Sequence, residues 1–279
     1  MNLEINNAVF IRRNEMYKLV ISDLDGTLLN ENHLLSEYTK KAIEKLNEKG
    51  VPFFLATGRH FIDLFDLKKE LKLPETYSIS CNGARVHGPN GELLISHDIN
   101  DDIANEVLSL EIDAEISHSV FTDDKIYVFD KKELEAYGER QHMPFEFVNK
   151  DNFKVKNAIK WFYHSENHDK LVKLDNMIKE KWGKHIDTMF SMDQCLEIMP
   201  KHVSKGYAIK EIAKLENINI NEIIAFGDGF NDLEMLSIVG KGCIMGNASE
   251  KLKKALPNNE IIGLNYEDAV AKYLEKLYL

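Results

Sequence analysis

Short runs of apolar and β-branched residues recur along the chain, and each run is followed by polar residues or glycine. The clearest runs are Leu19–Ile21, 51–56 and 223–226. Runs this short and this uniformly apolar are typical of strands buried on both faces of a parallel sheet. Between the first two, Ser36 is a suitable N-cap for a helix that ends near Lys49. The order strand, helix, strand predicts a right-handed crossover and an α/β fold with a doubly wound, Rossmann-like parallel sheet.

The pattern becomes less regular in the middle of the chain. Residues 85–99 resemble a hairpin that turns at Pro89–Gly91, residues 157–164 read as a strand, and residues 166–182 read as a helix. We therefore expect an inserted α+β cap domain over residues 85–193.

The predicted core domain consists of two separate segments, residues 17–84 and 194–279. Residues 1–16 precede the first predicted strand. We expect them to be an N-terminal extension of the fold or the result of an alternative translation start. They contain charged residues around a short apolar patch, which is unlike a secretory signal.

The first apolar run ends in two carboxylates, Asp23 and Asp25, followed by Gly26 and Thr27. In open α/β sheets, ligands bind beyond the carboxyl ends of the strands, so both acids are expected to face a crevice. Asp23 is the candidate nucleophile toward phosphorus, and Asp25 is the candidate acid and base. Two nearby carboxylates favour one shared proton, which suits that division of roles. The alternative is an Asp-Gly turn that only closes the strand.

The second apolar run ends in Thr57, Gly58 and Arg59. A hydroxyl and a glycine amide at the same sheet edge as Asp23 are suitable donors to phosphoryl oxygens, and a guanidinium can reach phosphate or another substrate group. An ordinary strand-to-helix turn explains the same residues, and it is the simpler interpretation if they are taken alone.

A third strand ends in acids at Asp228 and Asp232, one helical turn apart. Hard oxygen ligands that are few in number suit Mg²⁺ completed by water and phosphate. Lys205 begins a predicted helix, where the macrodipole disfavours a cation. Pairing of Lys205 with Asp23 and a bound phosphate would explain this position, and simple solvent exposure is the alternative.

Composition restricts the partners. The formal net charge is −11, so no polycationic surface favours nucleic acid or an anionic membrane. The cysteines, Cys81, Cys195 and Cys243, are odd in number and lack metal-ligand spacing, which favours reduced thiols and a cytoplasmic location.

Two further features of the middle segment are weak as functional signals. His164 and His168 have the spacing of a metal pair only on one helix, and no third ligand is evident. The aromatic run Trp161–Tyr163 is more typical of a strand interior than of a cofactor site.

Taken together, four segments resemble the motifs of the haloacid dehalogenase superfamily in their order along the chain: Asp23-Leu24-Asp25-Gly26-Thr27, Thr57-Gly58, Lys205-Gly206 and Gly227-Asp228-Gly229-Phe230-Asn231-Asp232. The segments around Arg59, Asn82–Ala84, Ser204–Gly206 and 245–248 further resemble its Cof-type phosphatases, which carry a large inserted cap. The family commonly has Glu-Asp-Gly after an asparagine near the end, whereas this chain has Ala269 in place of the glycine.

The resemblance implies a role for each matching residue. Asp23 would be the nucleophile and a Mg²⁺ ligand, and Asp25 would be the acid and base and lend its backbone carbonyl to the metal. Asp228 would complete the protein ligands, and Asp232 would support the metal site. The remaining implied contacts are to phosphate, from Thr57, Gly58, Lys205 and Asn231, and to the rest of the substrate, from Arg59 and Asn82.

The function implied by the resemblance is a Mg²⁺-dependent phosphatase for small phosphorylated metabolites, such as sugar phosphates, nucleotides or phosphorylated cofactors. A hexose-phosphate mutase of the same superfamily and a metabolite-binding regulator without turnover are the alternatives. Specificity is expected to lie in the cap, where Arg85, His87, Lys160 and His202 are possible contacts, although a structural role suits each of them better. The sequence does not predict the oligomeric state.

Overall fold

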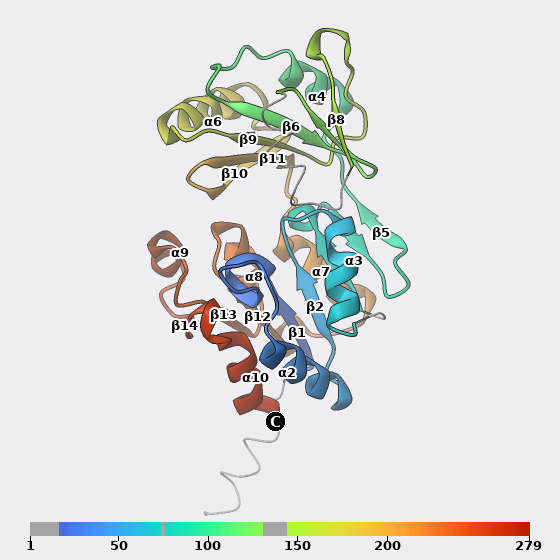
Figure 1. Cartoon of the computed structure of the whole chain (residues 1–279), viewed down its shortest axis with the longest axis vertical. Helices are drawn as coiled ribbons and strands as arrows, with labels where there is room; N and C mark the ends of the chain where they lie inside the picture. The colour runs from blue at the N-terminus through green and yellow to red at the C-terminus, as the bar shows by residue number, and fades with distance from the viewer. Residues whose placement is uncertain (1–16, 74–75, 131–143) are drawn as a thin grey trace, which may run out of the picture.

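The computed structural model of the chain describes residues 17–73, 76–130 and 144–279. It has two lobes, each built on its own sheet (Figure 1). The predicted N-terminal extension, residues 1–16, lies outside the described residues. Among the residues described, none of the helices combines the length and the apolar character that a bilayer span requires.

The larger lobe is built on an eight-stranded sheet. The five pairings from β14 to β3 are parallel, and the two that follow, β3 with β4 and β4 with β5, are antiparallel. The strand order across the sheet is β14 (Glu260–Ile261), β13 (Lys241–Ile244), β12 (Ile223–Gly227), β1 (Leu19–Ser22), β2 (Phe53–Ala56), β3 (Ser78–Ser80), β4 (Arg85–His87) and β5 (Leu93–Ser96).

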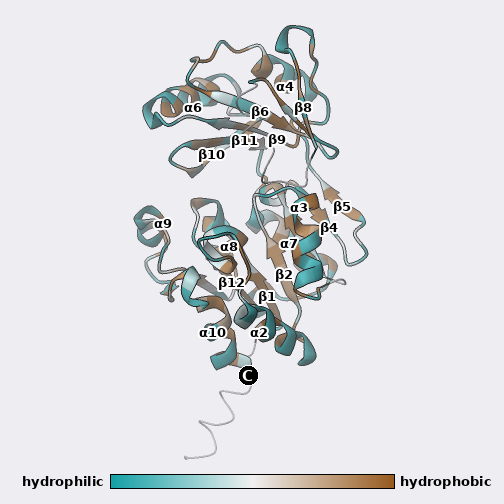
Figure 2. Cartoon of the chain, viewed as in Figure 1, coloured by the Kyte–Doolittle hydropathy of each residue, from teal (hydrophilic) through white to brown (hydrophobic). Residues whose placement is uncertain are grey.

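Helices cover both faces of this sheet, so the predicted doubly wound α/β core is confirmed. In β1, Leu19 and Ile21 face one hydrophobic cluster, which includes residues of α7 and α8, while Val20 faces the other, which includes residues of α2 and α10. Both faces are buried, which is why the strands are apolar without alternation (Figure 2). The helices of this lobe are α2 (Glu37–Glu48), α3 (Phe61–Glu70), α7 (Lys205–Leu215), α8 (Leu233–Ile238), α9 (Glu250–Ala255) and α10 (Ala269–Tyr278).

Two helix starts agree with the capping residues in the sequence. The hydroxyl of Ser36 accepts from the backbone N–H of Thr39 at 3.0 Å, and that of Ser204 accepts from the N–H of Tyr207 at 2.9 Å. Ala269, which replaces the glycine, is the first residue of α10, and Asp268 before it adopts a left-handed backbone with φ 57°. The substitution therefore leaves the helix start intact.

Over its described residues, the smaller lobe consists of a six-stranded sheet with two helices on one face. Its helices are α4 (Asp101–Leu108) and α6 (His168–Trp182), and Trp161 and Tyr163 pack beneath them. The strand order is β10 (Ile186–Met192), β11 (Cys195–Pro200), β9 (Lys160–His164), β6 (Ser117–Phe121), β7 (Ile126–Val128) and β8 (Phe145–Phe147).

The chain passes from one sheet to the other at residues that differ from the predicted domain boundaries of 85 and 193. The hairpin β4–β5 extends the eight-stranded sheet, and β11 belongs to the six-stranded sheet. A division of the chain by sheets therefore falls after β5 and after Pro200. We use "cap" below for the lobe of the six-stranded sheet and "core" for the other lobe.

Candidate active site

Three carboxylates come together at the carboxyl ends of two adjacent parallel strands. Asp23 follows β1, and Asp228 and Asp232 follow β12, which pairs with β1. One oxygen from each carboxylate lies within 4.8 Å of the others. We call Asp23, Asp228 and Asp232 the acidic cluster.

Lys205 lies against the acidic cluster and is fully buried. Its Nζ is 2.6 Å from Asp23 Oδ1 and 2.6 Å from Asp232 Oδ1. Burial alone would lower the pKa of Lys205, but the two carboxylates raise it above its usual value. The unfavourable position of this cation at the start of α7 is therefore explained by two ion pairs, and the solvent-exposed alternative is wrong.

Two carboxylates of the cluster, Asp23 and Asp228, resist ionisation. Burial raises the pKa of Asp23 well above its usual value, an effect that Lys205 only partly offsets. Burial and the neighbouring Asp232 raise the pKa of Asp228 to about 6, although the Thr27 hydroxyl donates to Asp228 Oδ1 at 2.7 Å. Buried carboxylates that repel one another are stabilised by a cation, so this environment suits a metal ion.

Asp232 is held by backbone donors as well as by Lys205. Its Oδ2 accepts from the N–H of Asp228 at 3.0 Å and of Gly229 at 2.9 Å. These bonds fix the turn that presents Asp228. The donor set of the cluster, hard carboxylate oxygens only, fits Mg²⁺.

Asp25 is paired with Arg59 rather than sharing a proton with Asp23. Arg59 forms a two-point contact, with Nε 2.7 Å from Asp25 Oδ2 and Nη2 2.5 Å from Oδ1, and His33 Nδ1 lies 2.8 Å from Oδ1. Burial acts to raise the pKa of Asp25, but Arg59 and His33 lower it overall. The expected division of one proton between Asp23 and Asp25 is therefore not what this arrangement shows.

The turn that follows Asp25 has little spare space. Gly26 has φ +78°, and a Cβ on it would lie 2.3 Å from Asp228 Oδ2. The side chain of Asn247 also donates to the Gly26 carbonyl at 2.7 Å. Glycine is required here both for the backbone conformation and for the approach of Asp228.

The predicted phosphate donors follow β2 at the same edge. Thr57 is buried, and its hydroxyl accepts from the backbone N–H of Arg59 at 3.1 Å. The Gly58 carbonyl accepts from Lys160 Nζ of the cap at 3.0 Å. The segment is thus fixed in place between the core and the cap.

Asn82 and Asn231 are bonded to each other. Asn231 Nδ2 donates to Asn82 Oδ1 at 3.0 Å, and Asn82 Nδ2 donates to Glu197 Oε2 at 3.0 Å. Asn82 is fully buried, and both ends of its amide bond to protein groups.

The possible cap contacts behave mainly as structural residues. Arg85 is buried and binds Asp98 and Asp123, at 2.5 Å and 2.7 Å. His87 is buried and stacks on Phe61, with ring centroids 3.4 Å apart. His202 is exposed, and its backbone N–H donates to Asp187 Oδ2 at 2.8 Å. Lys160 contacts Gly58, which follows β2 at the same sheet edge as the acidic cluster.

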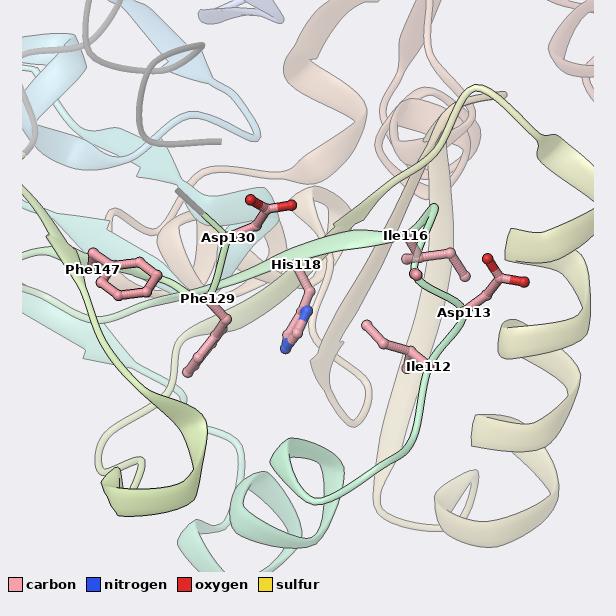
Figure 3. Close-up of a pocket in the computed structure, with 8 residues that line it drawn as sticks. Ile112, Asp113, Ile116, His118, Phe129, Asp130 and Phe147 are labelled. Carbon is pink, nitrogen blue, oxygen red and sulfur yellow. The ribbon is translucent and has the colours of Figure 1, made fainter. Parts of the chain in front are cut away.

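A separate cavity of about 440 Å³ lies in the cap (Figure 3). His118 lines it and pairs with Tyr163 across the β6–β9 ladder, on the sheet face that packs against the helices. Lys160 of β9 is on the opposite face and contacts the core, so the cavity does not belong to the acidic cluster. Its lining consists of Ile112, Asp113, Ala114, Ile116, His118, Phe129, Asp130 and Phe147.

Sequence reasoning missed two residues next to the site, His33 and Glu197. His33 lies in a loop with a left-handed backbone, φ 57°, and has no neighbouring motif. Glu197 interrupts the apolar strand Cys195–Pro200, and an acid buried in such a strand is the one signal that could have indicated it.

Comparison with known proteins identifies the class. A family model of haloacid dehalogenase-like hydrolases matches residues 20–274. A putative phosphatase of Buchnera aphidicola (subspecies Baizongia pistaciae) is 41% identical over 268 residues, which cover 94% of this chain and 99% of that protein. The HMP-PP phosphatase of Cronobacter sakazakii is 34% identical over 260 residues, covering 93% and 95%.

The solved structures agree. A haloacid dehalogenase-like hydrolase from B. subtilis superposes with a TM-score of 0.80 at 27% identity and covers 92% of this chain and 99% of that one. The chain belongs to the haloacid dehalogenase-like hydrolases. The predictions of the superfamily, of its fold with a capped core, and of a phosphatase-type hydrolase are confirmed.

Proposed function

We propose that this protein is a Mg²⁺-dependent phosphomonoesterase that hydrolyses small phosphorylated metabolites through an aspartyl-phosphate on Asp23. The observation that carries the proposal is the burial of Asp23 between Lys205 and the other two carboxylates of the acidic cluster. A carboxylate at this sheet edge can attack phosphorus, and the adjacent ammonium of Lys205 can stabilise the negative charge of a bound phosphate.

Asp23 is the nucleophile in this proposal. Its Oδ1 is held by Lys205, which leaves Oδ2 as the attacking oxygen. Attack forms the bond between this oxygen and phosphorus as the bond from phosphorus to the substrate oxygen breaks. Water then attacks the same phosphorus and regenerates the Asp23 carboxylate.

Asp25 is the acid and base. It must protonate the departing alkoxide and later accept a proton from water. Its pairing with Arg59 keeps it ionised here, so the pair has to loosen when substrate arrives. A phosphate monoester dianion competes with Asp25 for the guanidinium, and release of Arg59 would let the pKa of Asp25 rise.

Asp23, Asp228 and the backbone carbonyl of Asp25 would hold Mg²⁺, with Asp232 orienting Asp228 through the backbone bonds described above. When bound, Mg²⁺ supplies charge neutralisation at the phosphoryl oxygens and lowers the cost of ionising the carboxylates. Thr57, the Gly58 amide and Lys205 are the proposed donors to the same oxygens, and Asn231 orients groups beside them.

The position of the cap favours a small substrate. Strand β10 packs beside the Phe230–Asp232 turn that carries the last carboxylate, so the inserted lobe covers the catalytic edge (Figure 1). Such a cover limits access by folded phosphoproteins and excludes water. Relatives named HMP-PP phosphatase act on a small phosphorylated compound, which supports the same class here.

We also propose that the protein works in a reducing compartment such as the cytoplasm. Cys81, Cys195 and Cys243 are free and buried. Burial raises the pKa of each thiol to about 12, so none is poised as a thiolate.

The Asp25→Asn variant tests the covalent step. An aryl phosphate has a leaving group that departs without a proton, so Asp23 should still be phosphorylated, whereas hydrolysis of the intermediate should be slow. Acid quenching and mass spectrometry should then find the phosphoryl group on Asp23, and Asp23→Asn should carry none. Retained turnover in both variants, or a label on another residue, would rule out this mechanism.

A further inference from the structure

A row of three side chains connects the cap to the catalytic edge. Glu197 of β11 accepts from Asn82 Nδ2 at 3.0 Å, and Asn82 Oδ1 accepts from Asn231 Nδ2 at 3.0 Å. Asn231 lies between Asp228 and Asp232 in the sequence. We call Glu197, Asn82 and Asn231 the amide relay.

The backbone beneath the relay is rigidly held. Cys81 and Asn82 are both left-handed, with φ 47° and φ 54°, which non-glycine residues adopt only where other contacts enforce it. The N–H of Cys81 donates to Arg59 O at 2.8 Å, and that of Asn82 donates to Thr57 O at 2.9 Å. The position of Asn82 is thus fixed by the segment after β2, and only the orientation of its amide remains to be set.

Glu197 is itself held by a cation. Lys160 Nζ lies 2.9 Å from Glu197 Oε2, and both side chains are almost fully buried. Burial alone would lower the pKa of Lys160, but attraction to Glu197 outweighs this and raises it. The same ammonium donates to the Gly58 carbonyl at 3.0 Å. Glu197 therefore faces the core as a carboxylate paired with a buried cation.

The charge of Glu197 fixes the polarity of the relay. A carboxylate only accepts hydrogen bonds, so Asn82 must turn its NH₂ toward Glu197 and its C=O toward Asn231. Asn231 must then turn its own NH₂ toward Asn82, and its Oδ1 is directed away. Without an acceptor-only group at one end, two amides can bond in either direction.

We propose that Glu197 is a positioning residue of the cap, which sets the orientation of the Asn231 amide through Asn82 and so determines which atom of Asn231 faces the catalytic edge. This inference rests on the proposed function, in which Asn231 orients groups beside the phosphoryl oxygens. The cap then contributes to the chemistry through a side chain that does not touch the substrate.

Paired substitutions test the polarity. Glu197→Gln keeps the size of the side chain but can both donate and accept, so it no longer fixes the relay. Asn82→Asp places two carboxylates face to face. The double variant, Glu197→Gln with Asn82→Asp, moves the acceptor-only group to position 82, where it again requires the NH₂ of Asn231, while the new amide at 197 donates to it.

Both single variants should lower kcat toward an aryl phosphate with Mg²⁺ about tenfold with little change in KM, because the substrate-binding surface is retained. In Glu197→Gln the amide of Asn231 is no longer oriented, and in Asn82→Asp repulsion from the Glu197 carboxylate displaces the side chain that holds Asn231. The double variant should regain most of kcat, although the melting temperature need not follow the same order. Unchanged kcat in Glu197→Gln, or a double variant no better than either single variant, would overturn the inference. If Glu197→Gln does not fold, Asn82→Asp and the double variant make the same comparison.

A second readout separates this inference from the proposed function. The side-chain amide ¹H–¹⁵N resonances of Asn231 should shift in Glu197→Gln and return toward the wild-type position in the double variant. Wild-type protein without turnover would contradict the proposed function alone, and the resonances would still decide the relay. Resonances of Asn231 that do not respond to Glu197→Gln would overturn it.

Discussion

The ammonium of Lys205 lies 2.6 Å from Asp23 and 2.6 Å from Asp232, so one fully buried cation joins the ends of two adjacent strands. The two ion pairs of Lys205 therefore affect both the stability of the core and the proposed reaction at Asp23. Removing the cation would leave two carboxylates buried together, which is far less favourable than leaving them paired.

Lys205→Met should therefore destabilise the metal-free protein by about 3–5 kcal/mol and abolish phosphatase activity. Chemical denaturation measures the first effect, and phosphate release measures the second. Mg²⁺ should restore part of the stability without restoring turnover. A variant as stable as wild type in the absence of metal would contradict the role of Lys205 as the counter-charge.

Gly26→Ala should abolish Mg²⁺-dependent activity because its Cβ would collide with Asp228. Gly50→Ala is a matched control, since Gly50 has nearly the same φ, +74°, but no atom within 4 Å of the added Cβ. Both variants should lose about 1 kcal/mol of stability from the left-handed backbone. Equal activity losses in the two variants would show that backbone strain, not the displacement of Asp228, is responsible.

Magnesium should stabilise the protein more at about pH 7.5 than at about pH 5. The pKa of Asp228 is raised to about 6, so its neutral form is favoured by folding. Its contribution to stability is present below the usual carboxyl range and is lost as the pH rises through about 6. Above that point the metal offsets the loss, whereas below it protons compete for the same oxygens.

Melting temperatures with and without Mg²⁺ at the two pH values provide the measurement. Asp228→Asn should remove most of the metal-induced increase at the higher pH. An increase of the same size at both pH values would indicate that Mg²⁺ binds elsewhere.

Arg59→Ala should move the alkaline limb of the kcat/KM profile to higher pH. Burial already acts to raise the pKa of Asp25, and Arg59 and His33 together reverse that effect. Without the guanidinium, Asp25 stays protonated to higher pH and can still act as an acid. Arg59→Lys cannot make the two-point contact, so its alkaline limb should lie between those of Arg59→Ala and wild type. An unshifted limb would mean that Asp25 does not titrate in the profile.

The sequence predicted that these side chains gather at one edge of the sheet, and the reason is physical. Asp23, Thr57 and Asp228 each directly follow a strand that contains an apolar run, and parallel strands bring their carboxyl ends to one edge. The pairing of Lys205 was one of two alternatives, because a lysine at a helix start gives no information about what lies opposite it.

Other features depend on contacts that local patterns do not encode. The hairpin β4–β5 was assigned to the cap, since nothing in Arg85–Ser96 indicates which sheet it will join. Glu197 was missed because its partners, Lys160 and Asn82, are distant in the sequence. The bonds of Asn82 to Asn231 and Glu197 also join residues that are distant in the sequence, so the local pattern gave no sign of them.

The most direct test of the central claim is phosphate release from a panel of phosphorylated metabolites and a chromogenic aryl phosphate, with Mg²⁺ and with chelator, for wild type and Asp23→Asn. The account predicts turnover by wild type that requires Mg²⁺, and none by the variant. Folded, metal-loaded wild type that is silent across the panel, or an Asp23→Asn variant with substantial activity, would contradict it.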